Sequence, residues 1–269
     1  MTSKRGLFVV VDGLDVAGKG EGGVRALIER EQKLGKAVFD TIGFARAYAK
    51  GRPQVKDFYN PPHWLWHTIV TAEPSYTGTG QDFRERITSR ENAKLGIYTV
   101  EEQIDAVSVD RSVQMREVVI PALLRGLNVI QSRCVASTLA YQVEAGVRAG
   151  KDERELLEKI LAKDGTRLQL GEYRPDLLII MTIEDQEEFR KRLESRELTS
   201  KSDNSAFERW SFQQALIARY KSQQMRELFE SAGTRVAYIN TTDMSLEETK
   251  AKVAEEYEKF LNSRQDFNR

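Results

Sequence analysis

Short runs of apolar, largely β-branched residues alternate along this chain with longer segments in which apolar residues recur every three or four positions. Continuous apolar runs are typical of strands buried on both faces, and the longer periodic segments are typical of helices. The predicted strands are Leu7 to Val11, Lys36 to Asp40, Trp66 to Thr71, Leu127 to Gln131, Asp176 to Thr182 and Arg235 to Ile239. Strands that alternate with helices in this way predict a parallel sheet with helices on both faces.

The predicted helices lie between these runs. They cover Val24 to Leu34, Thr99 to Arg125, Ala136 to Ala149, Lys151 to Lys163, Asp185 to Arg196, Phe207 to Ser231 and Ser245 to Leu261. Ser245 with Glu248 three residues later has the pattern of a capping box, which predicts where the last helix begins. Residues 43–67 differ, because three prolines interrupt any long helix there, and we expect a long excursion between two sheet elements.

Composition narrows the class of protein. The 269 residues suit one domain, residues 1–269, and the 41 basic and 41 acidic side chains cancel. Zero net charge argues against bulk binding to nucleic acid or to an anionic membrane. No apolar run approaches the ~18 residues of a membrane helix, and the start of the chain enters a strand instead of a signal peptide. With a single cysteine, Cys134, and two histidines, we expect a cytoplasmic enzyme without disulfide or structural zinc.

One motif carries specific chemistry. Gly13-Leu14-Asp15-Val16-Ala17-Gly18-Lys19 matches GxxxxGK, which a chain of this length contains roughly 0.08 times by chance. The match follows a predicted buried strand and precedes a helix, the context in which backbone N–H groups cradle a phosphate and the lysine reaches the β- and γ-phosphates. The alternative is a tight glycine turn with Lys19 in solvent.

The position after Lys19 leaves the metal site open. A hydroxyl that would bind Mg²⁺ is replaced by Gly20, and Glu21-Gly22-Gly23 follow. Glycines at a helix start cost about 1 kcal/mol each relative to alanine, which suggests that a ligand or a neighbouring segment approaches closely. Glu21 is either a carboxylate favoured by the helix dipole or a metal ligand that replaces the hydroxyl.

The opening FVVVDGLDVAGKG resembles that of the thymidylate kinases, P-loop nucleoside monophosphate kinases that phosphorylate dTMP with ATP. Further segments are similar to the family in the same order: Thr71-Ala-Glu-Pro74, Val109-Asp110-Arg111, Ile120 to Gly126, Ser132-Arg133-Cys134, Ser137 to Gln142, Pro175-Asp176-Leu and Phe207-Glu208. The resemblance to a divergent branch of this family implies a three-layer α/β/α P-loop fold on a parallel five-stranded sheet. It also implies a helical lid at 190–206 and an insertion at 43–67.

The resemblance further implies roles for particular residues. ATP with Mg²⁺ would occupy the cradle, which comprises Gly13, Leu14, Asp15, Val16, Ala17, Gly18, Lys19, Gly20 and Glu21. The acceptor monophosphate would be bound by Asp15 near the sugar 3′-hydroxyl, by Glu73, by Arg111 and Arg133 at its phosphate, and by Tyr141 and Gln142 at its base. Lys19 would act as a catalytic residue at the phosphates. Arg192, Arg196 or Lys201 would neutralise the transferring group, because Val16 occupies the loop position where some family members carry an arginine. A homodimer is also implied.

Several family residues are absent here. The family's arginine before Glu-Pro is Ala72, the aspartate before Arg133 is Ser132, and a phenylalanine that stacks on thymine is replaced by Val107. We therefore expect phosphorylation of dTMP to dTDP, with two alternatives. One is a kinase for another pyrimidine monophosphate, and the other is a nucleotide-binding regulatory protein that has lost its metal chemistry.

Overall fold

A computed structural model describes residues 5–47, 51–59, 66–198 and 210–266 of the chain. Its centre is one parallel sheet of six strands in the order β2-β3-β4-β1-β5-β6. The strands are β1 (Phe8–Gly13), β2 (Val38–Asp40), β3 (Thr68–Ala72), β4 (Asn128–Ser132), β5 (Leu177–Thr182) and β6 (Arg235–Asn240). The α/β class is therefore confirmed, but the expected count of five strands is wrong, because β6 pairs with β5 in parallel along its whole length.

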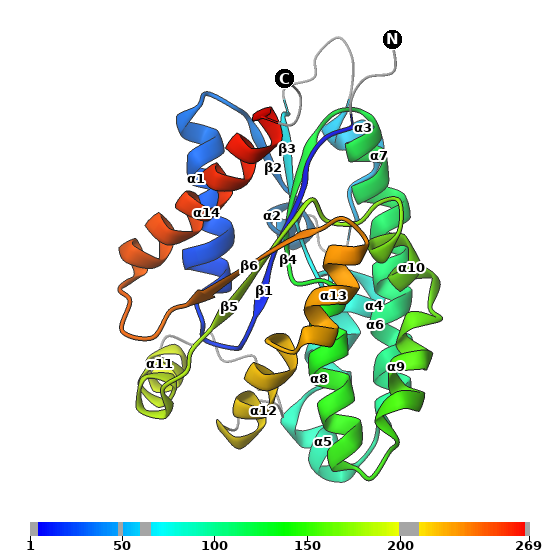
Figure 1. The fold of residues 1–269 in the computed structure, drawn as a ribbon. Coiled ribbons are helices and arrows are strands. Elements are labelled where there is room, and N and C mark those ends of the chain that lie inside the picture. Colours follow the sequence, from blue (N-terminus) through cyan, green and yellow to red (C-terminus); the bar gives the residue numbers. More distant parts are fainter. Residues whose placement is uncertain (1–4, 48–50, 60–65, 199–209, 267–269) are drawn as a thin grey trace.

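Helices cover both faces of this sheet, which gives three layers (Figure 1). α1 (Arg25–Lys33) and α14 (Leu246–Asp266) lie together on one side. The other side carries α6 (Val100–Gln114), α7 (Ile120–Leu124), α8 (Val135–Arg148), α9 (Glu153–Leu161), α10 (Asp164–Leu170) and α13 (Gln223–Ser231). The remaining helices are α2 (Thr41–Ala47), α3 (Val55–Phe58), α4 (Gly78–Asp82), α5 (Arg90–Leu95), α11 (Gln186–Leu198) and α12 (Trp210–Tyr220), with π-helical turns η1 (Lys19–Val24), η2 (Phe83–Ile87) and η3 (Met115–Val119).

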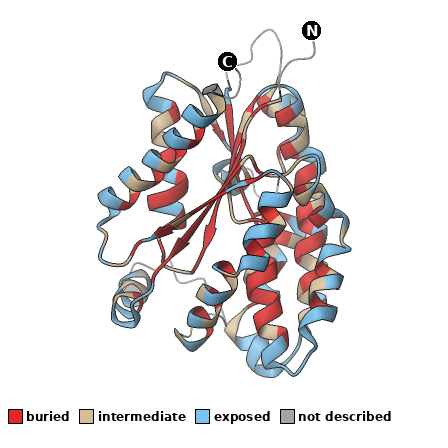
Figure 2. Ribbon diagram, viewed as in Figure 1, coloured by how far each residue is buried: buried red, intermediate tan, exposed pale blue. Residues whose placement is uncertain are grey.

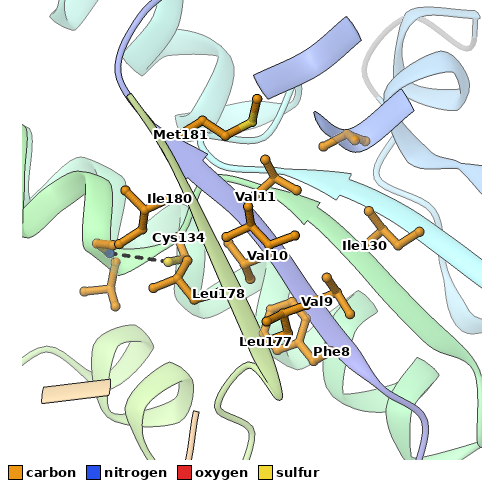
Figure 3. Packing of buried hydrophobic residues seen from close by; sticks show 14 of the residues in the cluster. Phe8, Val9, Val10, Val11, Ile130, Cys134, Leu177, Leu178, Ile180 and Met181 are labelled. Carbon is orange, nitrogen blue, oxygen red and sulfur yellow. Dashed lines mark hydrogen bonds between the residues drawn. The ribbon is translucent and has the colours of Figure 1, made fainter. Parts of the chain in front are cut away.

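The core lies between the sheet and these two helical layers (Figure 2). All six residues of β1 and all six of β5 are buried, so the continuous apolar runs are central strands covered on both faces. Figure 3 shows Val9, Val10 and Val11 of β1 packed beside Leu177 and Leu178 of β5. Within the described ranges, no helix combines the length and the apolar character needed to cross a membrane.

Two helix predictions need comment. The last helix begins as the capping box predicted: Glu248 accepts hydrogen bonds from the Ser245 backbone N–H at 2.8 Å and hydroxyl at 2.7 Å. The single helix predicted over Phe207 to Ser231 is wrong, because α12 ends at Tyr220 and α13 begins at Gln223. Ser222 caps the new helix by accepting from the Met225 N–H at 3.1 Å.

Candidate active site

The glycine-rich motif forms a loop between β1 and η1. At Gly13 the backbone φ is +127°, and a Cβ atom would lie 2.0 Å from the Met181 carbonyl oxygen, so only glycine fits. Gly18 has φ +84° and its carbonyl accepts hydrogen bonds from the N–H groups of Gly22 at 2.8 Å and Gly23 at 2.9 Å. The chain therefore turns from the buried strand into a helical start, as a phosphate cradle requires.

The glycines of η1 have two different causes. A Cβ at Gly22 would lie 2.6 Å from Thr249 Cγ2 of α14, and a Cβ at Gly23 would lie 2.6 Å from Val11 Cγ1. A Cβ at Gly20 would meet nothing within 4 Å. The neighbouring chain segment thus explains Gly22 and Gly23, while Gly20 borders open space.

Lys19 is only 9% exposed, so the alternative that placed it in solvent is wrong. Its ammonium donates to the Leu14 carbonyl oxygen and lies 3.9 Å from the Asp15 carboxylate. Asp15 also accepts from the Arg133 guanidinium and from Gln213 Nε2, the latter at 2.9 Å. The motif therefore brings a lysine and a carboxylate to the end of β1, where Arg133, which follows β4, adds a second cation.

A cleft of about 740 Å³ borders this loop. The predicted cradle residues that line it are Asp15, Val16, Gly18, Lys19, Gly20 and Glu21. Gly13, Leu14 and Ala17 are not among its lining residues; Leu14 and Ala17 are fully buried. Asp40, Ser132 and Arg192 contribute from other elements.

Arg192 projects from α11 to this cleft, but its guanidinium also has protein partners. It donates to Glu188 at 2.6 Å, to the Thr241 carbonyl at 2.6 Å and to the Met244 carbonyl at 3.0 Å. Thr241 in turn donates to the Ala17 carbonyl at 3.3 Å, so Arg192 links α11 to the phosphate loop. Arg196 also belongs to α11, but its side chain and the predicted lid residues 199–206 lie outside the described part of the chain.

A second cavity, of about 120 Å³, is also lined by Asp15. All six residues predicted to bind the acceptor line it: Asp15, Glu73, Arg111, Arg133, Tyr141 and Gln142. Phe83, Arg84, Thr88, Val107 and Thr138 are among the further lining residues. Positions that are distant in the sequence thus converge on one cavity.

The inner wall of this cavity is a buried ion pair. Arg111 is fully buried and its Nε donates to Glu73 Oε2 at 2.8 Å, while another of its nitrogens donates to Thr138 Oγ1 at 2.6 Å. Gln131 and Gln169 donate to the other oxygen of Glu73. Burial raises the pKa of Glu73, and the charge of Arg111 opposes that rise. Arg111 therefore reaches the cavity with much of its hydrogen-bonding capacity already used.

Arg133 borders both the cavity and the cleft. It has φ +65°, a left-handed conformation that is uncommon for non-glycine residues and is enriched at functional sites. Its guanidinium donates to Ser137 at 2.9 Å and lies 5.0 Å from the centre of the Tyr141 ring. Burial is the main cause of the raised pKa of the Tyr141 hydroxyl, so Tyr141 stays neutral beside Arg133.

Arg84 is a site residue that sequence reasoning missed. It lines both hollows, donates to the Pro74 carbonyl at 2.8 Å and lies 4.2 Å from the centre of the Tyr76 ring. Among the described residues, only Asp15, Arg84 and Arg133 line both the cleft and the smaller cavity. The resembling segments Thr71-Ala-Glu-Pro74 and Val109-Asp110-Arg111 do not include residue 84, so the resemblance contains no signal for this arginine.

A second missed group fastens the phosphate loop. Asp12, at the end of β1, is fully buried and accepts from the Ser137 hydroxyl at 2.6 Å, the Tyr220 hydroxyl at 3.0 Å and the Cys134 N–H at 2.9 Å. Both carboxylate oxygens of Asp12 thus accept hydrogen bonds from groups at the start of α8 and in α12. Asp12 is therefore a structural link and a poor metal ligand.

The carboxylates of the cleft suit a magnesium ion that arrives with a nucleotide. Among the residues that the structure describes, no cluster of three His, Cys, Asp or Glu side chains could hold a metal alone. Glu21 and Asp40 are exposed and line the cleft. Since Mg²⁺ in kinases needs one or two carboxylates and takes the remaining ligands from phosphates and water, this donor set fits.

A parallel α/β sheet with a phosphate loop at the end of β1 and an adjoining arginine-rich cavity defines a P-loop phosphotransferase. The sequence pattern of the thymidylate kinase family matches residues 63–253. The chain therefore belongs to the thymidylate kinase family and is a nucleoside monophosphate kinase.

Individual relatives agree with this assignment. The chain is 28% identical over 171 residues to a probable thymidylate kinase of Archaeoglobus fulgidus. This alignment covers 62% of the present chain and 72% of the relative. It is 29% identical over 155 residues to a thymidylate kinase of a Synechococcus species, with 57% and 69% covered. The solved thymidylate kinase of Candida albicans has a TM-score of 0.60 over 96% of this chain and 93% of its own, at 16% identity, and so shows a shared fold.

Proposed function

We propose that this chain is a single-domain kinase that transfers the γ-phosphoryl group of ATP to dTMP, forming dTDP and ADP. The observation that carries the proposal is the meeting of the two cavities at Asp15, Arg84 and Arg133. Phosphoryl transfer needs two anionic groups held in line while their charge is neutralised. A donor in the cleft and an acceptor in the smaller cavity would face each other across these three side chains.

The loop and its cations supply the donor side. Backbone N–H groups at the start of η1 would bind the β- and γ-phosphates, and the Lys19 ammonium would move from the Leu14 carbonyl to those oxygens. Glu21 and Asp40 would hold Mg²⁺, which when bound neutralises charge on the phosphates. Arg192, which lines the cleft, and Arg196 of the same helix are proposed to add positive charge at the transferring group.

The acceptor side would carry the nucleophile. An oxygen of the monophosphate forms the new bond to the γ-phosphorus while the bond from that phosphorus to the bridging oxygen of ADP breaks. Arg84 and Arg133 would neutralise the acceptor phosphate, and Asp15 would accept from the sugar hydroxyl. Arg111, already paired with Glu73, would contact the ligand from the inner wall.

The base would lie among Phe83, Val107, Tyr141 and Gln142. Arg133 lies 5.0 Å from the Tyr141 ring centre and Phe212 lies 6.1 Å from it, so much of the surface of that ring is already in contact. Phe83 is then the described aromatic side chain that can stack on a pyrimidine in place of the residue replaced by Val107. The Gln142 amide, which can donate and accept, would read the edge of the base.

The test is a coupled measurement of ADP release with ATP, Mg²⁺ and each of dTMP, dUMP, dCMP and dGMP. We expect turnover only when ATP, Mg²⁺ and a pyrimidine deoxynucleotide are all present, with dTMP the best acceptor. Lys19→Met should lower turnover by at least about 100-fold with an unchanged thermal midpoint, and Lys94→Met, on exposed α5, is the matched control. A preference for another monophosphate would replace dTMP, and nucleotide binding without turnover would overturn the kinase proposal.

We also propose a cytoplasmic homodimer. Val109 on α6 is 53% exposed and Leu124 on α7 is 56% exposed, so apolar side chains are available on one side of the molecule. Sedimentation equilibrium should give twice the 30.7 kDa chain mass, and a monomer at micromolar concentration would refute the dimer.

A further inference from the structure

Arg52 of the inserted segment forms hydrogen bonds with the loop after β3 and with α6. Arg52 donates from Nη2 to Ser75 Oγ at 3.2 Å and to Asp110 Oδ1 at 3.0 Å, and from Nε to Thr77 Oγ1 at 3.3 Å. Ser75 and Thr77 belong to the loop after β3 and Asp110 to α6, and both segments contribute residues to the lining of the acceptor cavity. The Arg52 guanidinium therefore joins the loop after β3 to α6.

Asp110 is the centre of this contact. Its carboxylate is fully buried and accepts from the Ser75 N–H and hydroxyl, each at 2.6 Å, as well as from Arg52. Within the described ranges, Arg52 is the ion-pair partner of this carboxylate. A buried carboxylate needs such a partner, because an uncompensated charge in the interior is strongly unfavourable.

The loop that Arg52 contacts, residues 73–77, also forms part of the wall of the acceptor cavity. Glu73 and Pro74 line that cavity, and the carbonyl groups of Pro74 and Ser75 accept from Arg84. A shift of this loop would therefore move Arg84, one of the three residues that border both cavities.

Two further contacts leave the loop little freedom. The Tyr76 ring contacts two cations, with the Arg84 guanidinium 4.2 Å and that of Arg46, from the insertion, 4.9 Å from the ring centre. On the inner side, a Cβ at Gly80 would lie 2.5 Å from Ser75 Oγ and 2.7 Å from Asp110 Cγ. Residues 73–77 are therefore held between the arginines of the insertion and the closely packed Gly80 and Asp110.

Three aromatic side chains of the insertion pack against the sheet. Phe44, Phe58 and Trp66 pack against Phe39 of β2, with ring centres 5.5, 6.1 and 5.2 Å away. None of the described insertion residues lines the acceptor cavity. Their packing anchors the insertion to the sheet, so that Arg46 and Arg52 are held over the loop.

We propose that the insertion is a built-in positioning device for the monophosphate site, and that Arg52 is a positioning residue that acts through Asp110 and residues 73–77 to set Arg84. The proposal rests on the proposed function, since it assigns the acceptor to this cavity. It assigns no contact between Arg52 and the substrate.

The experiment compares Arg52→Met and Arg52→Lys in the full chain. Arg52→Met should raise the KM for dTMP roughly 10- to 100-fold, because it loosens a positioning contact, and should leave the KM for ATP within about twofold. Arg52→Lys keeps the charge and should recover part of the loss. Arg125→Met is the control, because Arg125 contacts the insertion at Tyr59, 5.2 Å from the ring centre, and not at this loop.

A second readout does not need turnover. Amide hydrogen exchange over residues 73–84 should be faster in Arg52→Met than in the wild type, and unchanged in Arg125→Met. Asp110→Asn should remove most of the additional effect of Arg52→Met in the double variant. An inactive wild type with this exchange pattern would refute the proposed function alone. Unchanged exchange, or equal changes in both KM values, would overturn the role of Arg52.

Discussion

The phosphate loop and the acceptor cavity are neighbours that share Asp15, yet they are built in opposite ways. The loop is a contiguous stretch whose shape depends on backbone conformation, with Gly13 and Gly18 at positive φ. The cavity is built from side chains of the loop after β3, of α6 and of α8, joined by ion pairs such as Glu73–Arg111. The shape of the loop is therefore sensitive mainly to changes at its glycines, whereas the cavity is sensitive to the loss of one member of a charged pair.

The largest expected effect is on the buried pair. Arg111→Met leaves Glu73 as an uncompensated interior carboxylate, and should lower the free energy of unfolding by about 3–5 kcal/mol. Chemical denaturation measures this loss. The double variant Glu73→Gln, Arg111→Met removes both charges and should recover much of it; equal stability of the single and double variants would contradict the assignment.

In the phosphate loop and η1, two glycines three positions apart should respond differently to substitution by alanine. Gly23→Ala places a methyl group 2.6 Å from Val11 Cγ1 and should cost about 1–3 kcal/mol through overpacking. Gly20→Ala meets open space and should change the stability by no more than about 1 kcal/mol, in the stabilising direction. Thermal unfolding of the two variants compares them directly, and equal destabilisation would show that η1 is not packed as described.

A smaller effect is expected at the base. Phe83→Leu removes the proposed stacking ring and should raise the KM for dTMP about tenfold, equivalent to about 1.4 kcal/mol, with the KM for ATP unchanged. Steady-state kinetics at saturating ATP measure the first value. An equal rise in both KM values would indicate a general distortion and not the loss of stacking.

The smallest effect concerns α8, which carries Tyr141 and Gln142 to the cavity. Burial tends to raise the pKa of Glu144, but its hydrogen bonds with Arg148 and Arg219 outweigh burial and lower it. A lowered folded-state pKa stabilises the fold above the unfolded value near 4.5 and loses that effect as the pH falls through the folded value. Glu144→Gln should therefore cost about 1 kcal/mol at pH 7 and progressively less below pH 4, as urea titrations at both pH values would show.

Much of the fold was predictable because its signals are local. The central strands β1 and β5 contain continuous apolar runs, and the predicted bounds differ from β1, β4 and β5 by one or two residues. The break between α12 and α13 was missed, because Ser222 acts as a cap inside a segment whose apolar spacing continues past it. The edge strand β6 was among the predicted runs, yet the family pattern placed only five strands in the sheet.

The candidate site was predictable in part for the same reason. The phosphate loop is a window of seven residues, and the acceptor residues lie in motifs that keep their order. Arg52 and Gln213 were missed, since they act on Asp110 and Asp15 at separations of 58 and 198 residues. No local pattern marks a charged side chain whose partner is so distant in the chain.

The sequence by itself determined the order of strands and helices and the glycine turn after β1, because backbone conformation and burial depend on neighbouring residues. The tertiary structure alone decided that Gly22 and Gly23 serve packing while Gly20 borders the cleft, and that Arg52 and Arg84 belong to the acceptor site. The physical reason is that close contacts and buried charge pairs arise only when distant segments are brought together by the folded sheet.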